Sequence, residues 1–349
     1  MHKMMGRVDA VGGNQRVAYL DYARVIVALL VIVGHLVTYD CRGNGRMYIY
    51  AFHMPFFFMV SGMLHKYKGA IEWRKYARTL LRPAAVFIGA YIAISSVLFY
   101  FDFWDYDAVY HRPMPFGVIG IGIDQVYVTL KGVARGTQIA NIPCWFLLAL
   151  FWCKAMTDVL EKNKRYRYLL IGGGILLFAL MYKFNVLYLK QALMAFPIYY
   201  IGYKYKNTID GFLNVKFPVF VMIILFAVFI LSARFNGRTS MSLVRFGIHK
   251  LYSIPLFYLN GFVASMAVLY LSSLFKERQL VINAANSLVT ILCVQMLFCY
   301  TVKFTIGWAE ELSLLSFVYT LVIASVILVL CYLIHQILYK NLPWIYGKW

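Results

Sequence analysis

Charged residues are scarce in this sequence. They make up 14% of its 349 residues, whereas a typical soluble domain carries about 25%. Hydrophobic residues make up 62%, and the mean hydropathy is +0.70. This composition excludes a soluble enzyme and a disordered chain. The aromatic share of 18% also excludes a coiled coil or a fibre.

Cysteine is scarce as well. The sequence has six cysteines, none of them in a C-x-x-C pair. Most lie within apolar stretches, where a cysteine packs as a small hydrophobic side chain. A disulfide-stapled secreted module is therefore excluded, and no metal site is implied. We also expect no cleavable signal peptide, because the first apolar stretch, which begins near Tyr19, is too long for one.

The sequence does contain long apolar stretches bounded by charged residues. A helix that spans a membrane needs about 20 mostly apolar residues. The stretches predict an all-α integral membrane protein with about ten transmembrane helices, which form a single domain over residues 1–349. The predicted spans are residues 19–39, 47–64, 83–101, 143–159, 168–182, 188–203, 217–235, 252–274, 286–307 and 312–339.

The net charge of +20 comes from 34 Lys and Arg residues against 14 Asp and Glu residues. With a cytoplasmic N-terminus, alternating spans place most of these cations on the cytoplasmic side, as the positive-inside rule requires. The sequence therefore predicts two cytoplasmic termini, a cytoplasmic segment 1–18 and a long outer loop 102–142. Segment 234–250 disagrees, because its four cations fall on the predicted outer side. We expect membrane lipids as partners and no nucleic acid, since no compact basic domain is present.

The first predicted span carries three ionisable side chains, Asp21, Arg24 and His35. Each costs about 2.5–3.5 kcal/mol within a membrane, so it marks a functional site by default. Asp21 and Arg24 are three residues apart and can pair, although such a pair also suits a purely structural helix start. Arg24 and His35 share one helix face, about 16 Å apart along the axis. His35 is either a general base or a hydrogen-bonded packing residue.

The second predicted span adds His53, which lies near the predicted outer end at the depth of His35. We therefore expect the two histidines to converge in one cavity. Further along the same span, Ser61 and Gly62 are small enough to allow a neighbouring helix to approach closely.

Four motifs stand out along the chain. They are Leu20-Asp21-x-x-Arg24 followed by ten residues and His35, the stretch from Phe52-His53-Met54-Pro55 to Ser61-Gly62, Arg78-Thr79-Leu80-Leu81-Arg82-Pro83, and Pro143-Cys144-Trp145-Phe146-Leu147. In order and spacing they resemble the membrane-bound acyltransferase-3 family, especially its branch of fucose O-acetylase-like enzymes. The resemblance covers essentially the whole chain. It implies that an acyl group, most often acetyl, moves from a cytoplasmic thioester donor to a cell-surface acceptor across the bacterial inner (plasma) membrane.

The resemblance also implies site residues. The expected catalytic residues are His35, Arg24 and His53. The expected substrate-binding and donor-binding residues are Asp21, Ser61, Arg74, Arg78, Arg82, Trp145 and Gln295. The basic residues of segment 65–82 suit the phosphates of acyl-CoA, although positive-inside topology alone also explains them. Gln295 stands where many relatives carry a histidine and cannot titrate; if that histidine is catalytic in the relatives, another base or another acceptor is used here.

Acetyl-CoA is the expected donor, with its pantetheine arm along the helix face from Arg24 to His35. His35 then either deprotonates the acceptor hydroxyl or becomes acetylated and passes the group outward, and the sequence leaves both routes open. His53 holds the acceptor or tunes His35. The acidic and aromatic residues 102–107 suit a glycan or a lipid-linked sugar as acceptor, although an interfacial aromatic belt explains them more simply.

Two other classes of protein compete with this interpretation. In a secondary transporter or flippase, the intramembrane Asp, Arg and His side chains would line a substrate or proton route. This alternative predicts an inverted repeat in the sequence, and we find none. A non-catalytic scaffold would leave the intramembrane charged residues unexplained.

Overall fold

The computed structural model describes residues 18–37, 45–181, 185–213, 218–249, 252–307 and 314–347. These residues form helices joined by loops, with one isolated β-bridge between Ser240 and Arg245. The all-α prediction is therefore confirmed for the described part of the chain. The predicted N-terminal cytoplasmic segment lies outside the described residues, apart from Ala18 at the start of the first helix.

Each of the ten predicted spans corresponds to a helix. The helices are α1 (Ala18–His35), α2 (Gly45–Met63), α4 (Arg82–Tyr100), α7 (Trp145–Lys162), α8 (Arg167–Leu180), α9 (Leu189–Lys204), α11 (Pro218–Asn236), α12 (Ser253–Ser273), α14 (Leu288–Thr305) and α15 (Leu314–Asn341). By length and composition, seven helical stretches of the described residues can cross a membrane. Helices α2, α8 and α9 do not qualify, because α2 carries Arg46 and His53 and the other two have only 14 and 16 residues. The count of ten spans is therefore not confirmed.

The predicted outer loop 102–142 is largely helical, which the sequence analysis missed. It contains α5 (Tyr106–Tyr110) and the 19-residue α6 (Gly117–Arg135). Helix α6 packs against α4, where the Gln125 amide exchanges hydrogen bonds with two serine hydroxyls of α4, at 2.7 and 3.0 Å. Its three early glycines and its polar inner face obscured the helical pattern in the sequence.

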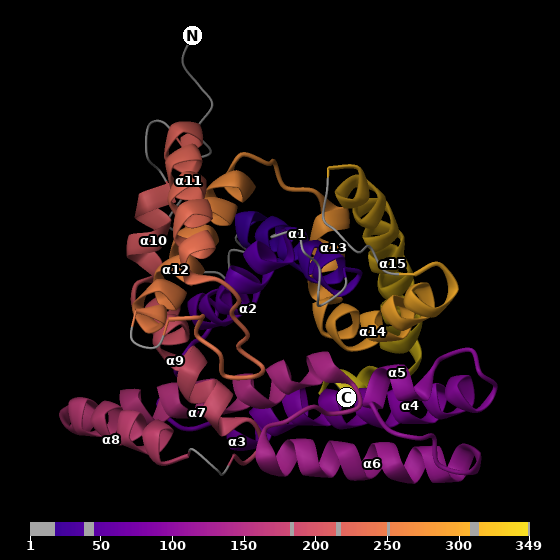
Figure 1. Ribbon diagram of the computed structural model, residues 1–349. Coiled ribbons are helices and arrows are strands. Elements are labelled where there is room, and N and C mark those ends of the chain that lie inside the picture. The colour runs from indigo at the N-terminus through magenta and orange to yellow at the C-terminus, as the bar shows by residue number, and fades with distance from the viewer. Residues whose placement is uncertain are drawn as a thin grey trace.

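Short helices complete the chain. They are α3 (Trp73–Tyr76), the π-helix η1 (Ala77–Leu81), α10 (Lys206–Leu213), α13 (Gln279–Asn286) and the 3₁₀ turns η2 (Ile142–Cys144), η3 (Lys164–Tyr166) and η4 (Pro343–Tyr346). Figure 1 shows α1 and α2 in the middle, α10 to α12 on the left, α13 to α15 on the right and α3 to α8 along the bottom. Helix α1 contacts α2, α12, α13, α14 and α15, so its side chains face the interior on several sides.

The backbones of α2 and α9 approach each other closely at two glycines. A Cβ on Gly62 would lie 2.0 Å from the carbonyl oxygen of Tyr199, and one on Gly202 would lie 2.1 Å from that of Met59. Only glycine fits at such distances, as is common between membrane helices. This contact fixes the position of α2, which carries the predicted residues His53 and Ser61.

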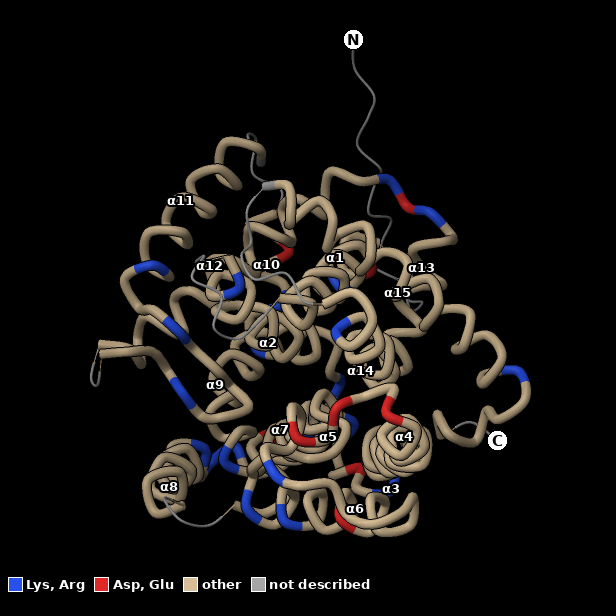
Figure 2. Tube along the Cα trace, turned by 45° about the vertical axis from the view of Figure 1, so that its right-hand side comes forward, with Lys and Arg blue, Asp and Glu red and all other residues tan. Residues whose placement is uncertain are grey.

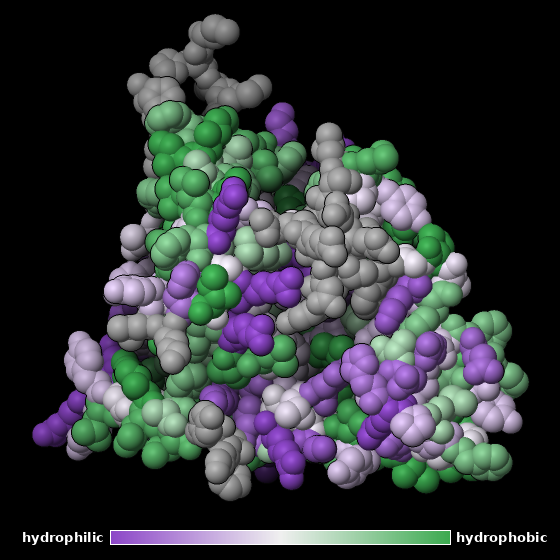
Figure 3. All heavy atoms as spheres, in the orientation of Figure 1, coloured by the Kyte–Doolittle hydropathy of each residue, from purple (hydrophilic) through white to green (hydrophobic). Residues whose placement is uncertain are grey.

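The outward faces of several helices are apolar. Within their apolar windows, only 17% of α11 and 22% of α15 are buried inside the protein. Figure 3 shows hydrophobic side chains over much of the α11 side, and Figure 2 shows that charged residues are sparse along α11 and α15. Exposed apolar area of this extent is not stable in water. The protein is an integral membrane protein.

Candidate active site

One face of α1 lines an internal cavity. Arg24, Ala28 and Val31 all contribute to its wall, at helical spacings of four and three residues. The next position on this face is His35, four residues or about 6 Å beyond Val31. The face predicted from the sequence is thus a cavity wall from Arg24 to Val31, and it leads directly to the histidine.

Helix α2 forms the opposite wall in the same way. Phe57, Val60, Ser61 and Leu64 line the cavity. His53 lies one turn before Phe57 on the same face, so it also stands just beyond the end of the cavity. We call this the histidine end and the other the Arg24 end.

The cavity holds about 150 Å³ and its walls are mostly apolar. Its polar lining residues are Arg24, Ser61 and Gln295, three of the residues predicted from the sequence. The apolar part of the wall includes Leu80 of η1, Phe146, Leu147 and Leu150 of α7, and Leu288, Val289, Ile291 and Leu292 of α14. Such a lining suits a largely apolar ligand with a few polar groups.

Around the histidine end, the ring of Tyr50 lies between the two histidines. Its centroid is 6.3 Å from that of His35 and 4.9 Å from that of His53. His53 Nδ1 lies 2.7 Å from the carbonyl oxygen of Ile49, so Nδ1 carries the proton and neutral His53 keeps a lone pair on Nε2. Whereas His53 is buried, His35 keeps part of its surface exposed. The structure therefore brings both predicted histidines to one place.

Arg46 joins this group, and the sequence analysis missed it. Its guanidinium lies 4.7 Å from the Tyr50 ring centroid and donates hydrogen bonds to the Tyr50 hydroxyl at 2.9 Å and to the Val37 carbonyl at 3.0 Å. Arg46 opens α2, one helical turn before Tyr50. In the sequence, Arg46 is only a charged residue at the start of a predicted span, and nothing there indicates that it lies near the two histidines.

At the Arg24 end, Arg24 and Asp21 form an ion pair on α1. Arg24 Nε also donates to the carbonyl oxygen of Leu20 at 3.3 Å. Asp21 is 1% exposed, so the ion pair lies largely out of contact with solvent on the aspartate side. The ion pair predicted from the sequence is therefore present. Arg24 lines the cavity, whereas Asp21 does not.

The other predicted binding residues lie away from the cavity wall. Arg74 and Arg78 are exposed, and Arg82 donates to the carbonyl oxygen of Trp344 at 3.1 Å. Their segment reaches the cavity through Leu80, within a π-helical turn of the kind that often marks functional sites. Trp145 is buried between Phe58 and Tyr188, at centroid distances of 6.3 and 6.2 Å, and therefore packs in the core.

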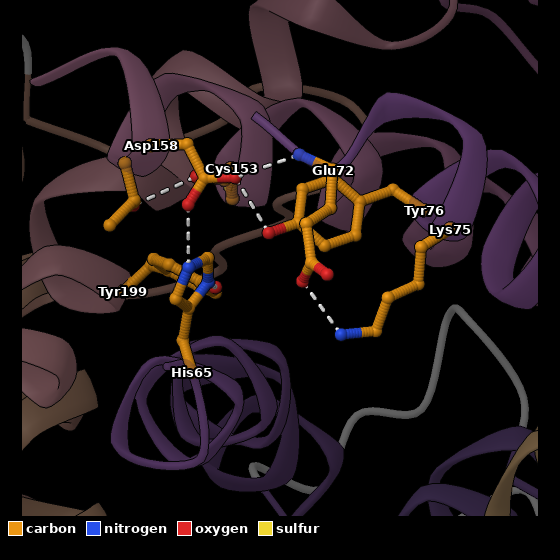
Figure 4. A network of polar contacts seen from close by, with 8 residues as sticks. His65, Glu72, Lys75, Tyr76, Cys153, Asp158 and Tyr199 are labelled. Carbon is orange, nitrogen blue, oxygen red and sulfur yellow. Dashed lines mark hydrogen bonds and ion pairs between the residues drawn. The ribbon is translucent and has the colours of Figure 1, made fainter. Parts of the chain in front are cut away.

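A buried polar network ties this segment to the helices, as Figure 4 shows. Asp158 on α7 is 0% exposed, and its carboxylate accepts hydrogen bonds from His65 Nε2 (2.9 Å), the Tyr76 hydroxyl (2.7 Å) and the Glu72 backbone N–H (3.4 Å). The Tyr199 hydroxyl of α9 donates to His65 Nδ1 at 2.6 Å. The sequence did contain a signal for this network, which the sequence analysis did not use. Asp158 and Lys154 are charged residues one turn apart within a predicted span.

Residues 102–107, Met114 and Phe304 line a second, open pocket of about 320 Å³. Tyr300 on α14 packs against two residues of this pocket. Its ring lies 5.5 Å from that of Trp104 and 6.3 Å from that of Phe304, and it is within electrostatic range of Arg46 and Tyr50. The pocket contains three carboxylates and several aromatic rings.

Among the residues that the structure describes, no three His, Cys, Asp or Glu side chains gather in a way that could hold a metal ion. The cavity wall is mostly apolar, and His35 and His53 lie one helical turn beyond its lining residues on α1 and α2. The profile of the acyltransferase-3 family, described as an acyltransferase domain, matches residues 17–336, and the chain belongs to this family. The protein is thus an integral-membrane acyltransferase. Comparisons with curated proteins and with solved structures gave no match.

Proposed function

We propose that this protein moves an acetyl or similar acyl group from cytoplasmic acetyl-CoA to a hydroxyl of a cell-surface glycan or lipid-linked sugar. One observation carries the proposal. The cavity walls on α1 and α2 both lead, on the same helix faces, to His35 and His53. A donor that enters at Arg24 therefore meets titratable groups at the far end of its path.

The donor enters from the cytoplasm, where acyl-CoA is made. With both termini in the cytoplasm, as the positive-inside rule requires, the Arg24 end of the cavity and the basic segment 65–82 both lie on the cytoplasmic side. The distance from Arg24 to His35 is about 16 Å along the helix, which suits an extended pantetheine arm. The apolar wall accommodates the arm and excludes water that would hydrolyse the thioester.

Arg24 binds a polar group of the donor at the start of this path. Arginine donates several hydrogen bonds in a fixed plane and stays charged in an apolar setting, which suits an anionic or carbonyl-rich ligand. The exposed Arg74 and Arg78 extend the positive charge outward to the nucleotide phosphates.

His35 performs the transfer at the histidine end. It acts either as the base that removes the acceptor proton or as a nucleophile that carries the acyl group. His53, with its free Nε2 lone pair, accepts a hydrogen bond from the acceptor hydroxyl or from His35. Arg46 holds Tyr50 between the histidines and adds positive charge where the tetrahedral intermediate forms.

The acceptor approaches from the pocket lined by residues 102–107. Its carboxylates accept hydrogen bonds from sugar hydroxyls, and its aromatic rings pack on the apolar faces of a sugar. The ring of Tyr300 packs against Trp104 of this pocket, and we assign the acceptor hydroxyl a route past Tyr300 to His35.

Purified protein with acetyl-CoA labelled in the acetyl group tests the proposal. We expect label to reach an added glycan lipid, and His35→Ala to abolish this transfer while its melting temperature stays near that of the wild type. His249→Ala is the matched control, since this histidine packs on Phe235 outside the cavity wall. Transport of a glycan lipid across proteoliposomes without acetylation, or full turnover by His35→Ala, contradicts the proposal.

A further inference from the structure

Gln295 is a buried amide with an unused hydrogen-bond donor in the cavity wall. Its side chain lines the cavity and is 1% exposed. Among the described residues, its Nε2 group has no hydrogen-bond partner. A buried N–H group without an acceptor costs about 1–3 kcal/mol, so a donor of this kind in a cavity wall is available to a ligand that accepts a hydrogen bond.

The position of Gln295 along the cavity indicates which part of the ligand it meets. Helix α14 starts at the Arg24 end, because the Tyr22 hydroxyl at the start of α1 donates to the carbonyl of Lys276, shortly before α13 and α14 (2.7 Å). Gln295 is the last residue of α14 on the cavity wall. Its amide therefore lies nearer the histidine end than the leucine and isoleucine side chains of α14 that line the cavity.

From this geometry we propose that Gln295 Nε2 donates a hydrogen bond to the thioester carbonyl oxygen of the acyl donor and holds the oxyanion that forms there. The inference rests on the proposed function, because it assigns a role within the same cavity. The nucleophile, either His35 or the acceptor oxygen, forms a bond to the carbonyl carbon, and the π electrons of the C=O bond move to its oxygen. When that negative oxygen collapses, the C–S bond breaks and the thiolate of CoA leaves with the electron pair. The acceptor proton completes the thiol.

A neutral amide is suited to this task in an apolar wall. The hydrogen bond that the amide donates strengthens as charge develops on the oxygen, and the amide needs no counter-charge in the resting state. It also explains why a titratable residue is not required at this position, since His35 and His53 provide the acid–base chemistry.

The test compares Gln295→Leu with the wild type in three measurements. We expect kcat for acetyl transfer to fall about 10²- to 10³-fold, the usual loss for one oxyanion donor. The Kd for CoA, which lacks the acyl carbonyl, should stay unchanged. The melting temperature should stay equal or rise, because the variant removes an unpaired buried donor. Gln295→Glu should lose at least as much activity, since a carboxylate accepts where the amide donates.

Asn260→Leu is the matched control. Asn260 on α12 is also a fully buried amide whose Nδ2 lacks a partner among the described residues, but it does not line the cavity. Its replacement should leave kcat per folded molecule unchanged. If the wild type transfers acetyl and Gln295→Leu does so at the same rate, or if CoA affinity falls in parallel with kcat, this inference is wrong while the proposed function stands. If the wild type transfers no label from acetyl-CoA, both fall.

Discussion

His65 and Asp158 are 93 residues apart in the sequence, and His65 Nε2 donates to Asp158 Oδ1 across 2.9 Å in the protein interior. Asp158 also accepts from Tyr76, which directly precedes the π-helical turn η1, and from the backbone of Glu72. One carboxylate thus connects the end of α2, helix α7 and the basic segment that leads to Leu80 in the cavity wall. The pair fixes segment 65–82 relative to the cavity.

Asp158→Asn should therefore weaken donor binding more than chemistry. Loss of one charge-assisted hydrogen bond is worth about 1.4 kcal/mol, so we expect KM for acetyl-CoA to rise about tenfold with a small change in kcat. The measurement is steady-state transfer at varied donor concentration. Glu161→Gln is the control, because Glu161 lies one turn further along α7 and binds Arg167 and Tyr200 instead. Equal changes in both variants, or a change in kcat alone, would rule out a positioning role for Asp158.

The same network predicts how stability depends on pH. Burial and the nearby charge of Lys154 lower the pKa of His65 below its usual value of 6.5, so the folded protein favours neutral His65. Its neutral form satisfies both neighbours, since Nε2–H donates to Asp158 and Nδ1 accepts from Tyr199. The unfolded chain takes up the proton near pH 6.5, so this contribution is complete above that pH and is lost as the pH falls below it.

We expect the free energy of unfolding to decrease by at most about 1.4 kcal/mol per pH unit from this group. Thermal unfolding in detergent between about pH 5 and pH 8 measures the effect. His65→Gln keeps a donor to Asp158 but does not titrate, so its pH dependence in the acidic range should be shallower than that of the wild type. Parallel curves for the two proteins would show that another group causes the acid sensitivity.

Arg24 can be separated from its partner by a pair of variants. Arg24→Gln alone removes an ion-pair partner from the buried carboxylate of Asp21, and breaking a buried pair in this way costs about 3–5 kcal/mol. Adding Asp21→Asn should restore most of the melting temperature, because neither group is then charged. Binding of CoA should remain weak in the double variant if Arg24 contacts the donor. Recovery of both stability and CoA affinity would assign the pair a structural role only.

The contact between α2 and α9 predicts a strong effect of one methyl group. In Gly202→Ala the new Cβ would lie 2.1 Å from the Met59 carbonyl oxygen, so the helices must separate. We expect a loss of about 1–3 kcal/mol, measured as a lower melting temperature. Gly89→Ala is the matched control within α4, where the Cβ has no heavy atom within 4 Å. That variant should be neutral or stabilising, since alanine favours a helix by about 1 kcal/mol over glycine.

The local parts of the site could be read from the sequence because a helix has a fixed period. Residues 24, 28, 31 and 35 share a face in any α-helix, so the charged face of α1 followed from spacing alone. The apolar stretches likewise marked the helices of the predicted spans. The helix α6 was missed, because its polar inner face and its glycines do not give the pattern of a buried or spanning helix.

Local sequence patterns were enough to predict the family, the helical class and the order of Arg24 and His35 along one helix face. The packing of whole helices was needed to show which helices complete the cavity, that Gln295 lies in its wall with an unused donor, and that Arg46 lies beside Tyr50 near the histidines. It also decided that Asp158 binds His65 and Tyr76. Side chains from distant parts of the chain meet only when whole helices pack, and that packing depends on close approaches such as Gly62 to Tyr199, which no short stretch of sequence specifies.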